Sequence, residues 1–337
     1  MMKISVLMAV YNSEKWLPQA LQSILVDQTH QDVELIAIDD CSTDRSPEIL
    51  AEWQVRDARL KVLRTPVNSG QAVARNLGIP GITGDVVCMV DSDDWLDSRA
   101  LELVVQPFEK NPDVDCALFR LVSDYGNGTQ EDYGMPYHDG DVINGAEAFR
   151  QSLTWAIHGL YAVRSDIQRK FPYDESARLY SDDNTTRIHY LHSRKVAFTG
   201  GTYYYRRHTE SMTVRISLDR FLYMKANLSM KRQLEREHVS PDILRLYEEH
   251  RWLNYIGQWA LYYNNKECFN ATERKEILER LRTCYSTFAG QPHRLKLGYV
   301  RLSPYALFVL QEKLYFTLRS IRERYRRSYC RATCTKS

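Results

Sequence analysis

Short apolar runs recur along the first 110 residues and alternate with longer segments that have a helical pattern. The runs at 4–9, 33–38, 60–63 and 85–90 predict strands, because each is short and rich in aliphatic residues. The segment 16–28 predicts a helix, and one of its faces carries Trp16, Leu17, Ala20, Leu21, Ile24 and Leu25. Strands that alternate with helices in this way predict a parallel sheet with right-handed crossovers.

Beyond residue 110 the pattern is less regular. We predict a strand over 116–122, a helix over 143–149, and an extended segment over 196–205 that two glycines interrupt. From Asp219 onward apolar residues recur at helical spacing, so the rest of the chain is predicted to be helical. No internal repeat and no low-complexity linker divides the sequence.

The composition is that of an ordinary globular protein. The chain has 337 residues, of which 44% are hydrophobic and 26% charged, and a formal net charge of +2. Seven cysteines, an odd number, do not form the pattern of a disulfide framework. The first apolar run is too short for a signal peptide, and no run of 18 apolar residues is present. We therefore expect a cytoplasmic protein.

An acidic cluster directly follows the apolar run at 85–90. It consists of Asp91, Asp93 and Asp94, with Ser92 between them. Ligands of open parallel sheets bind beyond the carboxyl ends of the strands, and carboxylates at such a point suit a hard divalent cation, which can hold a diphosphate. The alternative is an acidic turn that leads into the next helix, which Asp97 or Ser98 would cap.

Polar residues also follow the other predicted strands. They are Tyr11 with Asn12, Asp39 with Asp40, and Arg75 with Asn76. The loop after the first strand lacks the glycine pattern of dinucleotide-binding enzymes, and the chain has neither a P-loop nor a Gly-x-Ser-x-Gly elbow. These absences argue against dehydrogenases, P-loop nucleotidases and hydrolases with that elbow.

Four of these segments, in this order, closely resemble family 2 glycosyltransferases: ISVLMAVYN at 4–12, IDDCSTD at 38–44, NSGQAVARN at 68–76 and VDSDDWL at 90–96. The resemblance covers residues 3 to about 105. It implies a GT-A fold, that is, an α/β, Rossmann-like, mostly parallel sheet flanked by helices. It also implies a nucleotide-sugar donor and inversion at the anomeric carbon.

On this resemblance the chain divides into two regions. Residues 1–215 would form the GT-A catalytic domain, with a nucleotide-binding half over 1–110 and an acceptor-side half over 111–215. Residues 216–337 would form a helical C-terminal extension.

The resemblance also assigns roles to the donor-side residues. Asp40 would accept a hydrogen bond from uracil, which favours UDP, and Cys41 stands where the family usually has glycine. Arg75 would neutralise phosphate charge, although a surface salt bridge is the alternative for it. Asp93 would be the main metal ligand, with Asp91 at the ribose or the metal. The nucleotide-sugar-binding set is Ala9, Tyr11, Asn12, Asp40, Arg75, Asp91 and Ser92.

In the second half the resemblance is looser. The segment Ser181-Asp182-Asp183 resembles the signature that holds the catalytic base, for which we favour Asp183 over Asp182; capping of the next helix is the alternative. Inversion requires such a carboxylate across the donor sugar from the diphosphate, and general base catalysis contributes roughly 10²–10⁴-fold. The segment at 205–211 resembles Arg-x-His-x-x-Ser, which would place His208 at the diphosphate and the metal.

A further part of the acceptor side falls at Trp155, His158 and Gly159, where the family has a glycine loop. These residues would contact the acceptor sugar, with a structural role as the alternative. The predicted function is transfer of a sugar from a nucleotide-sugar, with UDP favoured, to a hydroxyl of a glycan or lipid-linked acceptor in bacterial surface polysaccharide or lipopolysaccharide synthesis. The implied cofactor is Mn²⁺ or Mg²⁺. The alternatives are a metal-dependent nucleotidyltransferase and a non-catalytic nucleotide-sugar-binding protein.

The C-terminal tail is strongly basic. Between 313 and 336 the acidic residue Glu323 stands against Lys313, Arg319, Arg322, Arg324, Arg326, Arg327, Arg331 and Lys336. Apolar residues interleaved with these cations predict an amphipathic helix that binds an anionic bilayer, peripherally on the inner face of the cytoplasmic membrane. A solvated terminal helix is the alternative. No nucleic-acid partner is expected, because no recognised nucleic-acid-binding module accompanies the patch.

Overall fold

The computed structural model describes residues 2–180, 182–208, 216–288 and 305–334. The chain divides into two compact units, Met1–Arg215 and Ile216–Ser337. Within the described residues, no helix combines the length and the apolar content that crossing a bilayer requires.

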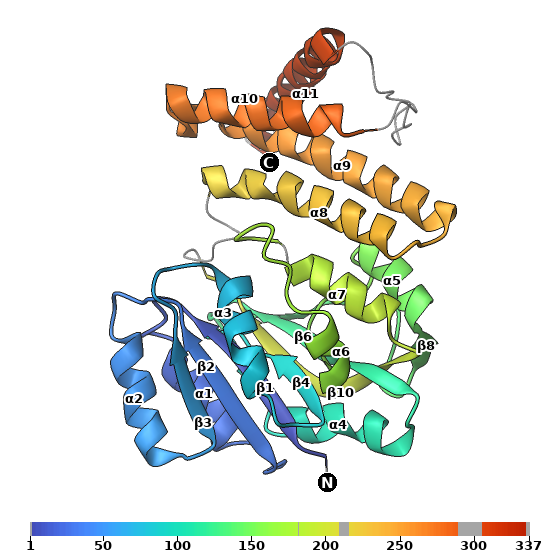
Figure 1. Ribbon diagram of the computed structural model, residues 1–337. Helices are drawn as coiled ribbons and strands as arrows, with labels where there is room; N and C mark the ends of the chain where they lie inside the picture. Colours follow the sequence, from blue (N-terminus) through green and yellow to red (C-terminus); the bar gives the residue numbers. More distant parts are fainter. Residues whose placement is uncertain (1, 181, 209–215, 289–304, 335–337) are drawn as a thin grey trace. The chain divides into compact units, whose positions relative to one another are not determined.

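The first unit is built on one mixed sheet (Figure 1), which has ten strands among the described residues. The main order is β3-β2-β1-β4-β9-β6-β10-β5, and β7 and β8 pair with β6 and β10. The strands are β1 (Ile4–Val10), β2 (Val33–Asp39), β3 (Leu60–Arg64), β4 (Val86–Met89), β5 (Trp95–Leu96), β6 (Val114–Asp124), β7 (Gln130–Asp132), β8 (Val142–Asn144), β9 (Tyr161–Arg164) and β10 (Lys195–Arg206).

The parallel arrangement predicted from the sequence describes the first half of this sheet. Strand β1 runs parallel to β2 and β4, and β2 runs parallel to β3. All seven residues of β2 are buried, as expected for a parallel strand covered on both faces. Beyond β4 the sheet is mixed, because β9 runs antiparallel to both of its neighbours, β4 and β6.

Helices cover this sheet. They are α1 (Leu17–Leu25), α2 (Ser46–Arg56), α3 (Gln71–Gly78), η1 (Ile79–Gly81), α4 (Ala100–Lys110), α5 (Gly145–Leu153), α6 (Ser165–Lys170) and α7 (Asp182–Leu191). The helix predicted over 143–149 begins at Gly145 instead. The preceding residues pair with β10 as strand β8, and the side chain of Asn144 caps α5 by accepting a hydrogen bond from the Glu147 amide.

Strand β10 links the sheet to the acidic turn. It is one long strand whose register against β6 shifts between Phe198 and Thr202, where the sequence has its two glycines. A Cβ atom at Gly201 would lie 2.6 Å from the backbone oxygen of Ala100, so this glycine permits a close approach to α4. Beyond the shift, β10 pairs with β5, which directly follows the acidic turn.

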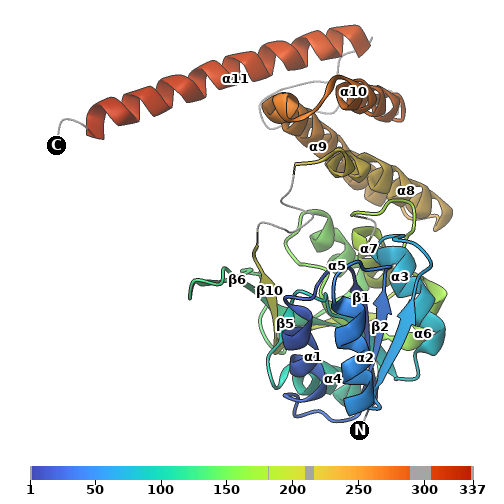
Figure 2. The same ribbon diagram turned by 90° about the vertical axis from the view of Figure 1, so that its left-hand side faces the viewer.

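The second unit is helical, as predicted. Its elements are η2 (Leu218–Leu222), α8 (Tyr223–Arg236), α9 (Pro241–Asn265), η3 (Lys266–Cys268), α10 (Ala271–Ser286) and α11 (Tyr305–Cys334). Its buried core is largely aromatic and includes Trp252, Tyr255, Trp259, Tyr285 and Phe308. Figure 2 shows α11 as one long helix.

Candidate active site

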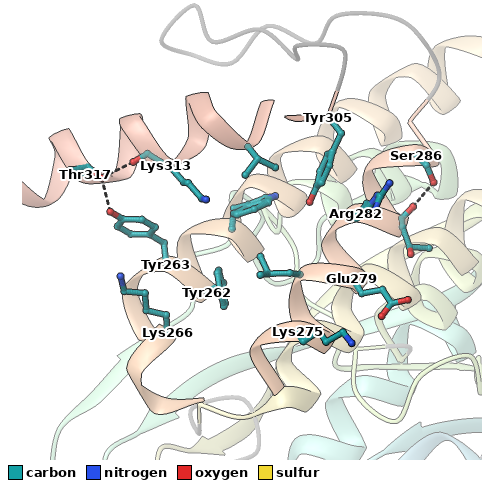
Figure 3. Close-up of a pocket in the computed structure, with 14 residues that line it drawn as sticks. Tyr262, Tyr263, Lys266, Lys275, Glu279, Arg282, Ser286, Tyr305, Lys313 and Thr317 are labelled. Atoms are coloured by element: carbon teal, nitrogen blue, oxygen red, sulfur yellow. Dashed lines mark hydrogen bonds between the residues drawn. The ribbon is translucent and has the colours of Figure 1, made fainter. Parts of the chain in front are cut away.

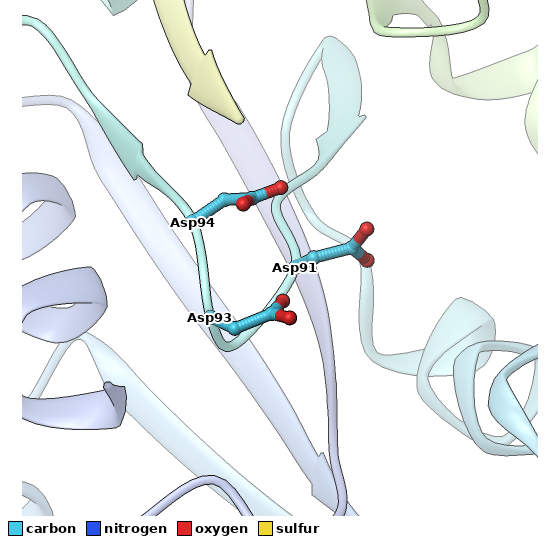
Figure 4. Close-up of side chains that lie close together, drawn as sticks. All are labelled: Asp91, Asp93 and Asp94. Carbon is cyan, nitrogen blue, oxygen red and sulfur yellow. The ribbon is translucent and has the colours of Figure 1, made fainter. Parts of the chain in front are cut away.

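The acidic turn after β4 gathers three carboxylates. Oxygen atoms of Asp91, Asp93 and Asp94 lie within 4.8 Å of one another (Figure 4). A backbone hydrogen bond of 3.1 Å from the Asp94 amide to the Asp91 carbonyl closes the turn. The side chains of Asp91 and Asp93 are about one-third exposed, whereas Asp94 is 1% exposed. The carboxylates of Asp91 and Asp93 are therefore accessible to solvent, whereas that of Asp94 is buried.

The surroundings of Asp91 and Asp94 disfavour the charged form of both side chains. Burial raises the pKa of Asp94 well above its ordinary value, and the charges of Asp93 and Asp91 raise it further. Burial also raises the pKa of Asp91, against the opposing charge of Arg75. Oxygen ligands in this arrangement fit Mn²⁺ or Mg²⁺, and a divalent cation would offset the mutual repulsion.

Tyr203 on β10 holds the acidic turn in place. Its buried hydroxyl donates a 2.8 Å hydrogen bond to Asp94 Oδ2 and accepts a 3.0 Å hydrogen bond from the Asp91 amide. Sequence reasoning missed this residue. The contact spans more than 100 residues and depends on how β10 lies beside the turn, so no local pattern signals it.

The end of β10 and the residues that follow it also reach the cluster. Arg206 donates from Nε to the Asp93 carbonyl at 2.8 Å, and its guanidinium lies over the rings of Trp16 and Trp95, 4.6 and 4.4 Å from their centroids. His208 Nε2 lies 2.9 Å from Asp93 Oδ2, and Nδ1 of the same ring has no partner within the described part of the chain. The structure thus brings His208 beside the predicted main metal ligand.

Arg75 is fully buried, so the alternative of a surface salt bridge is wrong. Its Nη2 donates to Asp91 Oδ1 at 2.5 Å and to Gln71 Oε1 at 3.1 Å. Gln71 in turn donates from Nε2 to Asp182 Oδ2 at 3.1 Å. Nε and Nη1 of Arg75 have no partner among the described residues. Buried donors without an acceptor are rare in folded proteins, so these two groups point to a partner that the chain itself does not supply.

The carboxylate of Asp40 is hydrogen-bonded to other residues of the protein. Its buried carboxylate accepts hydrogen bonds from Thr65 Oγ1 at 2.8 Å, from the Ser69 amide at 2.9 Å and from the Gly70 amide at 2.7 Å. Asp40 therefore fixes the loop that precedes α3, which carries Arg75.

Two residues near Asp40 have left-handed backbones. Asn12 has φ 49° and Cys41 has φ 61°. Asn12 Oδ1 accepts a 2.8 Å hydrogen bond from the Thr43 amide, which links the loops after β1 and β2. Asparagine tolerates this conformation, whereas Cys41 has the backbone for which glycine is favoured. The turn geometry associated with glycine is thus kept without glycine.

The remaining donor-side residues lie around the end of β1. Ala9 is partly exposed and pairs with Ile38 of β2, and Tyr11 is exposed. Ser92 is buried, and its hydroxyl lies 2.7 Å from that of Ser13. This contact joins the acidic turn to the loop after β1.

The two carboxylates proposed as the base lie at the start of α7. Asp182 is held by Gln71, whereas no described residue donates a hydrogen bond to the Asp183 side chain. Burial, together with the charge of Asp182, raises the pKa of Asp183 to about 8. Ser181, part of the same predicted signature, lies outside the described residues.

On the acceptor side only Trp155 presents a side chain at the surface, and the guanidinium of Arg187 lies 5.2 Å from its ring centroid. His158 is buried, accepts a 3.1 Å hydrogen bond from the Leu160 amide, and has its pKa lowered to about 4 by burial. A Cβ atom at Gly159 would lie 2.9 Å from Thr186 Oγ1. His158 and Gly159 thus have the surroundings of packing residues, which was the structural alternative.

Sequence comparisons agree with this geometry. The family described as Glycosyl transferase family 2 matches residues 5–166. An uncharacterized glycosyltransferase of Haemophilus influenzae is 46% identical over 99 residues, 29% of this chain and 39% of that protein. Glycosyltransferase GlyG of Streptococcus pneumoniae is 29% identical over 224 residues, 62% of this chain and 72% of that protein. A poly(ribitol-phosphate) beta-glucosyltransferase of Bacillus spizizenii is 32% identical over 220 residues, 63% of this chain and 34% of that protein.

Comparisons with solved structures show the same fold. S. aureus TarS 1–349 in complex with UDP-GlcNAc has a TM-score of 0.66 at 18% identity, over 86% of this chain and 82% of that one. Mannosyltransferase PcManGT from Pyrobaculum calidifontis, in complex with GDP-Man and Mn²⁺, has a TM-score of 0.54 at 16% identity, over 82% of this chain and 79% of that one. The fold is therefore GT-A, and residues 5–166 of the chain belong to the family 2 glycosyltransferases.

Proposed function

We propose that this protein is a metal-dependent, inverting glycosyltransferase. It moves a sugar from a nucleotide-sugar, UDP-linked by preference, to a hydroxyl of a glycan or lipid-linked acceptor in bacterial surface polysaccharide synthesis. The observation that carries this proposal is one edge of the sheet that holds three clustered carboxylates beside a fully buried arginine with unused donors.

The donor side is supported by Arg75. Its Nε and Nη1 groups are buried without an acceptor, and a donor phosphate would supply one. As a fixed cation, Arg75 would stabilise the negative charge that grows on the departing nucleoside diphosphate. Neighbours of the same fold were solved with UDP-GlcNAc and with GDP-Man, which supports a nucleotide-sugar donor. Because these two ligands differ in their nucleobase, the nucleobase of the donor is a question for the assay below.

The metal would be held by Asp91 and Asp93, with His208 beside Asp93. A divalent cation in this place supplies charge neutralisation to a diphosphate. Asp94 is bound to Tyr203 and to the Arg206 amide, so its role is to support the turn.

Asp183 would act as the general base. With a pKa raised to about 8, Asp183 is a stronger base than an ordinary aspartate, and its charged, proton-accepting form predominates above that pH. The hydroxyl oxygen forms a bond to the anomeric carbon as the bond to the diphosphate breaks, and the proton passes to Asp183. Asp182 is held by Gln71, so we assign it a positioning role.

The test compares Asp93→Asn and Asp183→Asn with Asp242→Asn, which changes an exposed aspartate on α9. UDP release from UDP-sugars, and stabilisation by UDP, are measured with Mn²⁺ and with EDTA. We expect Asp93→Asn to lose the metal-dependent stabilisation. Asp183→Asn should keep it but lose roughly 10²–10⁴-fold in transfer. Unchanged turnover in Asp183→Asn would remove the base assignment.

The same assay separates the rival functions. A nucleotide-sugar-binding protein without activity would show donor stabilisation but no UDP release in any variant. A nucleotidyltransferase would release pyrophosphate in place of UDP. Either result would overturn the proposal.

Helix α11 has an exposed aliphatic face that could bring the enzyme to a membrane, where a lipid-linked acceptor would lie. Its exposed aliphatic residues recur every three or four positions and form one stripe, named here the leucine stripe: Leu307, Leu310, Leu314, Leu318 and Ile321. The opposite face carries the buried Phe308, Glu312 and Phe316. Exposed cations, among them Lys313 and Arg322, flank the stripe, and each contributes about 1 kcal/mol at an anionic surface. We propose that the leucine stripe binds an anionic membrane surface.

Vesicle sedimentation tests this binding. Wild type should pellet with vesicles of phosphatidylglycerol more than with phosphatidylcholine alone, and Leu310→Ser/Leu314→Ser should remain in solution. Equal pelleting of both proteins would overturn the proposal. So would a wild-type dimer that the double substitution converts to a monomer, because a second copy would then cover the stripe.

A further inference from the structure

A groove of about 1030 Å³ lies within the helical second unit. Its walls are formed by α9, α10 and α11, together with Lys266 of η3 (Figure 3). None of its lining residues belongs to Met1–Arg215, so it is no part of the candidate active site. Its volume is at the upper end of the range of small-molecule sites, which is about 300–1,000 Å³.

One part of the groove is aromatic. It is lined by Trp259, Tyr262 and Tyr263 from α9 and by Tyr305 from α11. The Tyr263 hydroxyl lies 2.7 Å from Thr317 Oγ1, which fixes the ring between α9 and α11. Aromatic side chains of this kind offer an apolar face together with a polar group at the edge. Sugar rings, with their C–H faces and hydroxyl rims, match both.

The other part of the groove is basic. Lys266, Lys275, Arg282 and Lys313 line it, against the single lining carboxylate of Glu279. In Figure 3 these cations come from three different elements around the hollow. Among the described residues, Lys275, Arg282 and Lys313 form no ion pair, although many other cations of this unit do. Three cations without carboxylate partners around one hollow favour an anionic ligand.

We propose that this groove binds an anionic glycan, that is, sugar rings that bear phosphate or carboxylate groups. A neutral glycan would leave the cations unused, and an anion without rings would leave the aromatic part unused. A few linked sugar rings fill a hollow of this size. The site goes beyond glycosyl transfer, because it would retain the glycan whether or not a donor is bound.

Defined oligomers test the proposal by isothermal titration calorimetry on the full chain. The probes are tetragalacturonate, which has rings and carboxylates, maltotetraose, which has rings alone, and tripolyphosphate, which has charge alone. We expect tetragalacturonate to bind about tenfold or more tightly than either other probe, and its affinity to fall as salt is added. Equal affinity for all three probes, or no binding of tetragalacturonate, would overturn the proposal.

Two variants and one matched control locate the site. Lys275→Gln/Arg282→Gln should weaken tetragalacturonate binding about tenfold and reduce its salt dependence. Tyr262→Ala should weaken tetragalacturonate but leave tripolyphosphate unchanged. Lys225→Gln, which changes an exposed lysine on α8 outside the groove, should have no effect. If Lys225→Gln weakens binding as much as the double variant, the interaction is a general charge effect and the groove is not the site.

Donor stabilisation by UDP and Mn²⁺ is measured on the same proteins. The groove variants should keep it, because no residue of the groove contributes to the donor side. Loss of glycan binding with donor stabilisation intact supports the groove, whatever the outcome of the transferase assay. A groove variant that lost both glycan binding and donor stabilisation would be disturbed in its folding. The other groove variant, Tyr262→Ala or Lys275→Gln/Arg282→Gln, then provides the test.

Discussion

At the scale of single residues, Asp183 couples a proposed catalytic role to a cost in stability. Burial and the charge of Asp182 raise its pKa to about 8, whereas an aspartate in an unfolded chain titrates near pH 4. The folded state therefore holds this proton more tightly than the unfolded state. The contribution of Asp183 to the free energy of unfolding is largest below about pH 4 and declines as the pH rises to about 8.

The substitution Asp183→Asn removes this titration. We expect the variant to melt several degrees above wild type at pH 9, and to show no such gain at pH 4, because each kcal/mol corresponds to about 2–4 °C in a folding unit of the size of Met1–Arg215. Thermal melts over a pH series measure the difference, and Asp242→Asn should follow wild type throughout. A gain that does not change with pH would mean that Asp183 titrates normally.

Several site residues could be predicted from the sequence because their chemistry is local. Asp91, Asp93 and Asp94 cluster because they share one turn. The contact of His208 with Asp93 is long-range, and only the resemblance pointed to that region; the roles assigned to these residues stay predictions. Tyr203 could not be predicted, since its bonds to the turn depend on tertiary pairing.

At the scale of elements, the start of α5 depends on the absence of a side chain. A Cβ atom at Gly145 would overlap the backbone oxygens of Ser193 and Tyr190, at the end of α7. By contrast, nothing lies within 4 Å of a Cβ atom at Gly257, in the interior of α9. The two glycines therefore have opposite consequences for the helices that contain them.

Gly145→Ala should lower the free energy of unfolding by about 1–3 kcal/mol, because backbone atoms must move to admit the methyl group. Gly257→Ala should raise it by about 0.5–1 kcal/mol, because alanine favours the helix. Urea denaturation of the two variants beside wild type measures both changes. Equal effects of the two substitutions would contradict the packing described for α5 and α7.

Whether an element was predictable depended on how far its signal extends along the chain. The strands β1, β2 and β4 could be predicted because each is a short run of apolar residues, and most of these residues are buried. The direction of β9 relative to β4 and β6 is set by the path of the whole chain, so the change from a parallel to a mixed sheet was not visible. Helix α5 was misplaced by two residues at its start, because β8 forms only through its pairing with β10.

At the scale of the whole molecule, the two units have separate cores. The main core of the first unit draws its buried residues from Ile4 to Tyr203, and the aromatic core of the second from Phe221 to Phe316. Every residue assigned to the donor, the metal and the base lies before Arg215. Every residue of the glycan groove lies after Ile216.

A fragment ending at Arg215 should therefore unfold cooperatively and be stabilised by UDP with Mn²⁺, but should not bind tetragalacturonate. Thermal melts and calorimetry on the fragment and the full chain test each part. A fragment without a cooperative transition would show that the second unit is required for the first to fold. A folded fragment that binds tetragalacturonate would place the glycan site elsewhere.

The contact of the Arg206 guanidinium with the rings of Trp16 and Trp95 has a practical consequence. Arg206 donates a hydrogen bond to the Asp93 carbonyl, and the ring of His208 lies 5.3 Å from that of Trp16. Both indoles therefore lie beside residues that would bind the metal and the donor. Any rearrangement of His208 or Arg206 on loading changes the surroundings of a natural fluorophore. Tryptophan emission should thus report occupancy in real time without an added label, and Trp16→Phe and Trp95→Phe would show which ring supplies the signal.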